Sequence, residues 1–266
     1  MAMLSMNEMT TFRWSFSQDV AAYCAAGIPA IGVWRRKLAD FGEERGIELL
    51  AESGLEVSNL LWAGGFTGSD GRTYRESVDD AGEAVRLAAA MSAGTLVTHS
   101  GARGGHTFNH AKRLFYGALE ELAPLAADLG VTLAIEPMHP ECGAEWTFLA
   151  SVDDALDVIN ELCFPNVKLV FDTYHLCQNG ELIDRIAELA PHIAVVHLGD
   201  SRQPPSPDQN RTPLGSGTVP LKRIIAALAA AGYDGYYDVE LMGEEIESSD
   251  YEQLLSQSKR VFDELA

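Results

Sequence analysis

The sequence has 266 residues, of which 47% are hydrophobic, and its 19 basic and 39 acidic residues give a formal net charge of −20. This length suits one α/β barrel domain or two smaller domains, and the hydrophobic content is sufficient for a large core. The negative charge opposes binding to nucleic acid and favours a small neutral substrate or a cation.

Short apolar or β-branched segments alternate with longer helical patterns along the whole chain, as expected of an α/β fold. The predicted strands, in chain order, are 10–16, 30–34, 55–62, 94–100, 131–137, 167–172, 193–198 and 236–241. The clearest helical patterns between them are 110–130, which closes on a glycine, and 151–163, which opens on a serine N-cap. Eight strands alternating with helices predict that residues 1–266 form a single (β/α)8 TIM barrel, with a doubly wound open sheet as the alternative.

The last four predicted strands each end with a residue type that binds metal ions. These residues are Glu136, Asp172, His197 and Glu240. Because the carboxyl ends of barrel strands meet at one mouth, we expect the four side chains to lie together, although any one of them alone could be an ordinary capping group. Three carboxylates would repel one another unless a cation lay between them. The sequence therefore predicts one divalent ion per chain, with Mn²⁺, Mg²⁺ or Co²⁺ preferred over Zn²⁺ and Mn²⁺ first among them.

Tryptophans end the first three predicted strands. They are Trp14, Trp34 and Trp62. In a barrel they would lie across the mouth from the metal ligands, where indole faces can pack against the C–H face of a sugar. The alternative is that they plug the barrel without contacting a substrate.

At these strand ends the sequence resembles the xylose isomerase-like TIM barrel family, which includes ketose 3-epimerases, inosose-processing enzymes and endonuclease IV. The resemblance to the ketose 3-epimerases implies that the four strand-end residues bind the metal. It also implies that Glu136 and Glu240 act as acid and base on opposite faces of the substrate carbon. The motif DTYH, at 172–175, implies that His175 contacts a substrate oxygen, and HLGDSR, at 197–202, implies that Arg202 binds a hydroxyl.

One departure leaves the substrate open. The epimerases carry a further substrate-binding glutamate six positions after the glutamate of the fifth strand, whereas this chain has Cys142 there and Glu141 beside it. The segment EPMHP, at 136–140, resembles homologues that act on 3-oxo-glycosides, in which a loop histidine serves as base. His139 is therefore a candidate catalytic residue, with a solvent-facing loop histidine as the alternative.

Endonuclease IV represents a different class of function. It uses additional zinc-binding histidines, including an Asp-x-His pair after the seventh strand, where this chain reads NRTPLGSG without a histidine. His99 resembles one of the other zinc ligands and is otherwise a candidate substrate contact. Arg211, the second residue of NRTPLGSG, is a candidate residue for binding the substrate, with a solvated loop arginine as the alternative. The missing histidines and the negative charge argue against DNA repair.

The predicted activity is a metal-dependent sugar isomerase or epimerase that works through an enediolate. A metal-bound ketone and hydroxyl would acidify the neighbouring C–H, and a carboxylate would take the proton. Returning it to the other face gives epimerisation, and returning it to the next carbon gives isomerisation. Expulsion of a β-substituent, a 3-oxo-glycoside lyase reaction, is the second hypothesis, and a non-catalytic sugar-binding barrel is the third. The GSG at 215–217 lacks the P-loop pattern, which favours an unphosphorylated sugar.

The sequence also bears on the cellular location of the protein. Its four cysteines contain no Cys-x-x-Cys pair, so neither a disulfide framework nor a thiolate metal site is predicted. The N-terminus lacks a signal-peptide pattern, and no run of about twenty apolar residues occurs. We expect a cytoplasmic protein that does not span the membrane, and a homo-oligomer is compatible with the sequence.

Overall fold

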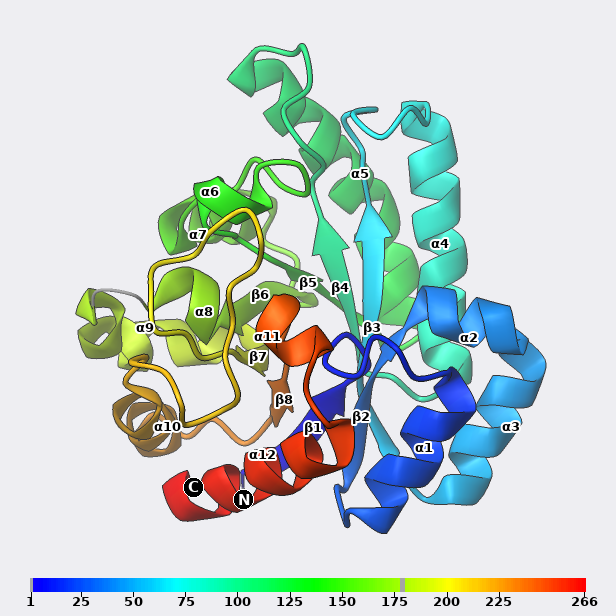
Figure 1. The fold of residues 1–266 in the computed structure, drawn as a ribbon. Helices are drawn as coiled ribbons and strands as arrows, with labels where there is room; N and C mark the ends of the chain where they lie inside the picture. The colour runs from blue at the N-terminus through cyan, green and yellow to red at the C-terminus, as the bar shows by residue number, and fades with distance from the viewer. Residues whose placement is uncertain (1, 178–179) are drawn as a thin grey trace.

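The computed structural model describes residues 2–177 and 180–266. Its strands form a closed parallel barrel in the order β1 to β8, which confirms the predicted (β/α)8 fold (Figure 1). The strands are β1 (Met3–Asn7), β2 (Ala30–Trp34), β3 (Glu56–Gly64), β4 (Thr95–His99), β5 (Thr132–Ile135), β6 (Val167–Asp172), β7 (Ile193–Leu198) and β8 (Tyr236–Val239).

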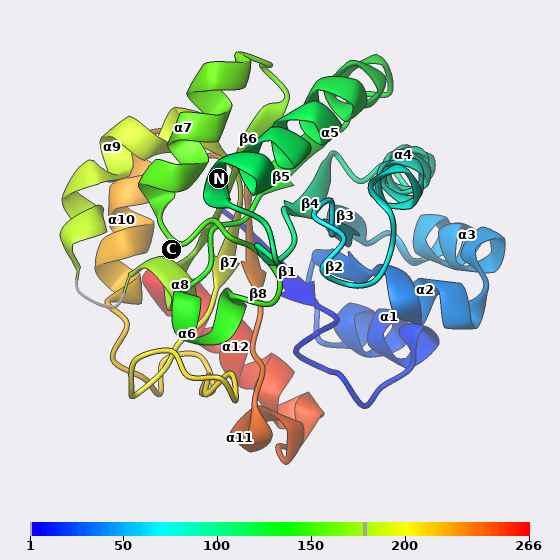
Figure 2. The same ribbon diagram turned by 90° about the horizontal axis from the view of Figure 1, so that it is seen from above.

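Helices surround the barrel, and the view from above shows them as a ring outside the strands (Figure 2). The α-helices are α1 (Phe16–Ala25), α2 (Arg35–Phe41), α3 (Glu43–Ser53), α4 (Tyr74–Ala90), α5 (Phe108–Asp128), α6 (Pro140–Gly143), α7 (Val152–Leu162), α8 (Thr173–Leu176), α9 (Ile186–Leu189), α10 (Leu221–Ala230), α11 (Glu244–Glu247) and α12 (Tyr251–Leu265). Two 3-10 helices, η1 (Glu181–Arg185) and η2 (Ala190–His192), flank α9. Across residues 2–177 and 180–266, every helix is too short or too polar to cross a membrane.

Neighbouring residues along each strand face opposite sides of the barrel wall. Inside the barrel, one residue from each of β3 to β7 joins a small apolar cluster. These residues are Leu61, Val97, Ala134, Val170 and Val195. Their strand neighbours, such as Leu60, Leu96 and Leu169, belong to the larger core beneath the helices. Burial on both faces explains why the strands read as continuous apolar segments in the sequence.

Seven of the eight predicted strands are confirmed, and β2, β6 and β7 have the predicted boundaries. The first prediction is wrong, because β1 covers Met3–Asn7 and residues 10–16 form turns and the start of α1. Ser15 is the N-cap of that helix, and its backbone N–H donates to Gln18 Oε1 at 2.9 Å. The aromatic residues of 10–16 imitate a strand, whereas the Ser-x-x-Gln spacing is a capping box.

A buried ion pair fixes the loop between β1 and α1. Lys37 Nζ lies 2.6 Å from Asp19 Oδ2 and also donates to the backbone carbonyls of Glu8 and Thr11, at 3.1 and 2.9 Å. The side chains of Lys37 and Asp19 are almost completely buried. Burial, together with the nearby charge of Asp19, raises the pKa of the Glu8 carboxyl well above its ordinary value. Lys37 therefore compensates a buried acidic cluster below the mouth of the barrel.

We expect Lys37→Met to destabilise the fold by about 3–5 kcal/mol, the usual effect of removing one member of a buried pair. Lys259 provides the control, because it forms an exposed pair with Asp263 at 3.0 Å, so Lys259→Met should change the unfolding free energy by less than about 0.5 kcal/mol. Urea unfolding followed by circular dichroism measures both. Equal midpoints for the two variants would contradict the assigned role of Lys37.

Candidate metal centre and substrate cavity

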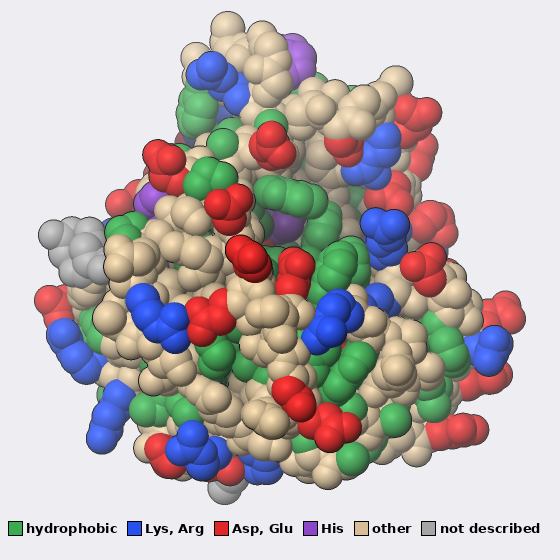
Figure 3. All heavy atoms as spheres, viewed as in Figure 1, with side chains coloured by type: hydrophobic (Ala, Val, Ile, Leu, Met, Phe, Trp, Pro, Cys, Tyr) green, Lys and Arg blue, Asp and Glu red, His purple; other side chains and the backbone are tan. Residues whose placement is uncertain are grey.

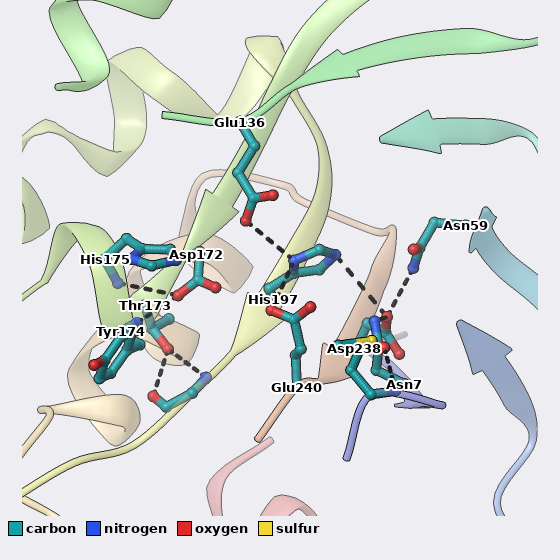
Figure 4. A network of polar contacts seen from close by, with 12 residues as sticks. Asn7, Asn59, Glu136, Asp172, Thr173, Tyr174, His175, His197, Asp238 and Glu240 are labelled. Carbon is teal, nitrogen blue, oxygen red and sulfur yellow. Dashed lines mark hydrogen bonds and ion pairs between the residues drawn. The ribbon is translucent and has the colours of Figure 1, made fainter. Parts of the chain in front are cut away.

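The four predicted ligands converge at the carboxyl ends of β5 to β8. Glu136 follows β5, Asp172 ends β6, His197 lies in β7 and Glu240 follows β8. Each residue offers one ligand atom, and these atoms all lie within 4.8 Å of one another. The strand register brings Asp172 opposite His197. Figure 4 shows the carboxylates of Glu136, Asp172 and Glu240 around the His197 ring.

The donor atoms of this cluster fit a metal ion. His197 Nδ1 lies 3.5 Å from Glu136 Oε1 and 3.5 Å from Glu240 Oε2. The His197 nitrogens and Glu136 Oε1 are buried without a hydrogen bond, and a buried polar atom without a partner is costly unless something binds it. A cation beside His197 Nδ1 and Glu136 Oε1 would satisfy those two atoms, whereas His197 Nε2 faces Asp238.

The charged groups of the cluster shift one another's pKa values. Burial raises the pKa of the Glu136 carboxyl, but its contacts with His197 and His99 outweigh burial and hold that pKa well below its ordinary value. Burial likewise opposes charge on His197, but the carboxylates of Glu240 and Glu136 raise the pKa of its imidazole well above the ordinary value. The carboxylates therefore keep their negative charge despite burial.

Arg211 provides a fixed positive charge beside the ligands. Its side chain is completely buried, with Nη1 3.0 Å from Asp172 Oδ2 and Nη2 3.3 Å from Glu240 Oε2. Its guanidinium also lies 4.4 Å from the centre of the Tyr174 ring. With His197 neutral, as metal ligation requires, one guanidinium among three carboxylates leaves two negative charges, which a divalent cation would balance.

Asp238 lies inside the barrel beside His197, and no sequence motif predicted it. Asp238 Oδ2 lies 4.0 Å from His197 Nε2 and accepts hydrogen bonds from Asn7 Nδ2 and Asn59 Nδ2 at 2.7 and 2.8 Å (Figure 4). A Cβ at Gly32 would collide with this oxygen. Its sequence signal is the Asp-x-Glu spacing with Glu240, since residues two apart on a strand share a face.

A cavity of about 500 Å³ opens above the cluster, and its lining includes Glu136, Glu240, His175, His99 and Trp62. Figure 3 shows this hollow with hydrophobic side chains, a histidine and acidic side chains around it. His99 Nε2 lies 2.8 Å from Glu136 Oε2. Four predicted substrate contacts therefore line the cavity, namely Trp62, His99, His175 and Arg211. Of these, His99 also contacts the predicted metal ligand Glu136.

Two other predicted tryptophans do not line this cavity. Trp34 ends β2 as predicted and stacks on Trp62 with ring centroids 6.3 Å apart. Trp14 lies in the segment that is not a strand, packs edge-on against Tyr251 at 5.2 Å and lines a separate surface hollow. The predicted position of Trp14 at the mouth is therefore wrong, because that prediction depended on the misplaced first strand.

The loop from 199 to 220 separates the two candidate arginines. Arg202 is half-exposed and pairs with Glu245, with its Nη1 2.8 Å from Glu245 Oε2, whereas Arg211 is buried at the ligands. Asp200 is buried at the base of the loop and accepts backbone N–H bonds from Gly215 and Gly217 at 3.0 and 2.9 Å. Arg202 is therefore not part of the described lining of the cavity, and its guanidinium joins the loop to α11.

The loop after β5 holds the candidate His139 and also Cys142. His139 is the N-cap of α6, where its Nδ1 accepts the Glu141 backbone N–H at 3.4 Å, and its side chain does not line the cavity. Cys142 does line it, and its Sγ lies 3.6 Å from His175 Nδ1. Burial raises the pKa of the Cys142 thiol to about 11. Trp146, also in the lining, carries no motif and was missed by the sequence analysis.

Comparison with known proteins finds similarity to an isomerase and an epimerase. An inosose isomerase from Bacillus velezensis is 31% identical over 128 residues, which is 46% of this chain and 44% of that protein. A ketose 3-epimerase from Arthrobacter globiformis is 28% identical over 139 residues, which is 52% of this chain and 44% of that protein. The chain thus matches less than half the length of either relative.

The fold similarity extends over the whole chain. The IOLI protein, solved with a bound zinc atom, superposes with a TM-score of 0.85 at 21% identity, covering 99% of this chain and 97% of that one. The family model described as xylose isomerase-like TIM barrel matches residues 20–265. With the closed barrel and the clustered strand-end ligands, this match shows that the chain belongs to the xylose isomerase-like TIM barrel family.

Proposed function

We propose that the protein is a divalent-metal-dependent sugar isomerase or epimerase that moves a proton on the carbon beside a carbonyl. The observation that carries the proposal is the convergence of three carboxylates and one imidazole at the floor of a sugar-sized cavity. The named relatives, an isomerase and an epimerase, support the same class of reaction.

Glu136, Asp172, His197 and Glu240 would hold the metal ion. Their oxygen-rich donor set favours Mn²⁺, Mg²⁺ or Co²⁺, with Zn²⁺ as the ion bound by a structural relative. When bound, such an ion supplies Lewis-acid polarisation of the substrate carbonyl and of the hydroxyl beside it. We propose one ion per chain.

Glu136 and Glu240 are the proposed proton-transfer groups. Each has one oxygen held by a neighbouring donor, because His99 Nε2 lies 2.8 Å from Glu136 Oε2 and Arg211 Nη2 lies 3.3 Å from Glu240 Oε2. In Glu136 the other oxygen, Oε1, faces the cluster, 3.5 Å from His197 Nδ1, whereas in Glu240 the same Oε2 contacts both Arg211 and His197. Two carboxylates in one site can serve as base and acid for the same carbon. Burial lowers the pKa of the nearby His175 imidazole, so we propose that neutral His175 binds a substrate hydroxyl.

The lyase alternative assigns the base to His139. The position of the His139 side chain argues against that assignment, because it caps α6 and does not line the cavity. A non-catalytic barrel is disfavoured by the two glutamates on the cavity floor. We therefore prefer isomerisation or epimerisation. All four cysteines are free thiols, which supports a proposed cytoplasmic location.

Metal analysis and isotope exchange test this function together. The protein purified without chelator should contain about one divalent ion per chain, as one four-ligand set implies. A panel of ketoses and 3-oxo sugars in D₂O should reveal a member that gains deuterium beside its carbonyl, and EDTA should stop the exchange. Protein that neither contains nor takes up a divalent ion would refute the proposal.

A further inference from the structure

A second hollow of about 750 Å³ adjoins the metal-site cavity. It lies between the ends of β3 and β4 and the start of α4, and its lining includes Arg35, Ser69, Arg72 and Ala102. The two hollows share four lining residues. These are Trp62, His99, Glu145 and Trp146. The shared residues make the two hollows neighbouring parts of one depression.

The metal-site cavity alone, at about 500 Å³, lies within the range of pockets that hold an entire small ligand, roughly 300–1,000 Å³. A single sugar with its carbonyl at the metal ligands would leave the second hollow to solvent. We propose that the two hollows bind one substrate, a keto sugar joined through a glycosidic bond to a second, uncharged sugar unit that lies in the second hollow. This inference rests on the proposed function and adds the class of substrate.

The charges in the second hollow favour an uncharged unit. Arg35 Nη2 lies 3.0 Å from Asp80 Oδ1, and Arg72 lies 3.0 Å from Asp80 and 2.7 Å from Asp70. These two arginines are the basic side chains of the described lining, and both are held in ion pairs. A phosphate in the hollow would have to break those pairs. A neutral sugar requires only hydrogen bonds, and the Glu145 carboxylate can accept them from its hydroxyls.

Aromatic side chains lie where the two hollows meet. Trp146 is 43% exposed, and its ring lies edge-on against Trp62 with centroids 5.0 Å apart. The backbone of Trp146 is held on both sides, since its N–H donates to Gly143 O and its carbonyl accepts from Gly101 N, each at 2.9 Å. A fixed indole at the junction offers a face for the C–H surface of the second sugar.

Glycines let the wall of the second hollow pack closely. Gly65 and Gly101 have φ values of +81° and +91°, a region that favours glycine. A Cβ at Gly65 would collide with Asp70, and a Cβ at Gly101 would collide with Thr67 Oγ1. The segments that follow β3 and β4 therefore approach each other closely through glycine backbone, which fixes this wall of the hollow beside Trp62.

Matched pairs of sugars test this inference with the Mn²⁺-loaded protein in D₂O. In the first pair, D-fructose is compared with lactulose, which adds a galactosyl unit. In the second pair, 3-oxo-D-glucose is compared with 3-oxo-sucrose, which adds a fructosyl unit. D-fructose 6-phosphate tests whether the hollow accepts an anionic group instead. We expect the glycosylated member of a pair to show about tenfold higher kcat/KM for deuterium exchange, the order of one aromatic contact. The phosphate should give no such gain.

Ala102→Trp, which fills the second hollow, should bring the kcat/KM ratio of each pair close to one. Trp146→Ala should lower the same ratio by removing the indole. The control is Ala127→Trp, the same substitution on the exposed outer side of α5, which should keep the wild-type ratio. Circular dichroism and metal content establish that each variant is folded.

The possible outcomes distinguish a failure of this inference from a failure of the proposed function. Equal exchange of free and glycosylated sugars, or an unchanged ratio in Ala102→Trp, would overturn the second subsite and leave the isomerase or epimerase proposal standing. A gain with D-fructose 6-phosphate in place of lactulose would show that the hollow binds an anion and would also overturn the inference. No exchange with any sugar would reject both proposals.

Discussion

Replacing His197 with alanine is expected to weaken divalent-ion binding by at least about 100-fold, since loss of a group that merely supports a ligand costs 10- to 100-fold. His197 supplies the nitrogen donor of the cluster and lies between Glu136 and Glu240, 3.5 Å from each. Without it, the three carboxylates and Arg211 remain, but the donor set is incomplete. Titration with Mn²⁺ followed by electron paramagnetic resonance measures the affinity.

The barrel of the His197→Ala variant should remain folded, because the strand ends contribute less to stability than the core does. The matched control is His192→Ala, a half-buried histidine in η2 just before β7. It should bind Mn²⁺ as the wild type does. Unchanged Mn²⁺ affinity in His197→Ala would mean that His197 is not a ligand.

The fold and the four ligands could be predicted because both follow from local pattern. Strands buried on both faces produce apolar runs, and a polar residue at the end of such a run stands out. Closure of the barrel then brings the carboxyl ends of the strands together, so the clustering of the four residues follows from the fold alone. The first strand escaped prediction because Met3–Asn7 has no β-branched residue, whereas the aromatic segment after it has strand-like composition.

The remaining residues of the site depend on how loops fold back. Arg202 and Arg211 share one loop, and nothing local distinguishes them. Asp200 closes that loop by accepting several of its backbone N–H groups, and Arg211 N–H bonds to Met242 O at 3.1 Å beyond β8. These long-range bonds turn Arg211 inward. Trp146 and Asp238 likewise gain their positions from neighbours distant in sequence.

Isotope exchange with glutamate variants should show how the proton moves. A carboxylate that takes a proton from carbon exchanges it with solvent, so turnover in D₂O should place deuterium beside the carbonyl, and it should do so only with metal present. Glu136→Gln and Glu240→Gln each keep one ligand oxygen but cannot accept the proton. Each should lower kcat by about 10²- to 10⁴-fold, the usual contribution of a positioned acid or base.

The two variants should differ in the face of the carbon that they affect. With two bases on opposite faces, Glu240→Gln should abolish exchange on one face and Glu136→Gln on the other, as stereospecific NMR of the recovered sugar would show. Both are compared at saturating Mn²⁺, and Glu83→Gln on the outer surface of α4 is the control, since Glu83 is 75% exposed. His139→Ala should stay near wild-type activity, because His139 caps α6 outside the cavity.

A different pattern would identify a different chemistry. If one glutamate variant kept nearly full activity while His139→Ala lost it, a single base in the loop after β5 would carry the reaction, and the lyase alternative would become the better assignment. That result would require the α6 loop to turn His139 from its helix cap into the cavity. Turnover without deuterium uptake in the wild type would instead point to direct hydrogen transfer between carbons, or to a base shielded from water through the whole cycle. Neither of these last two cases would label substrate recovered before completion, whereas a base open to water labels the remaining substrate as well as the product.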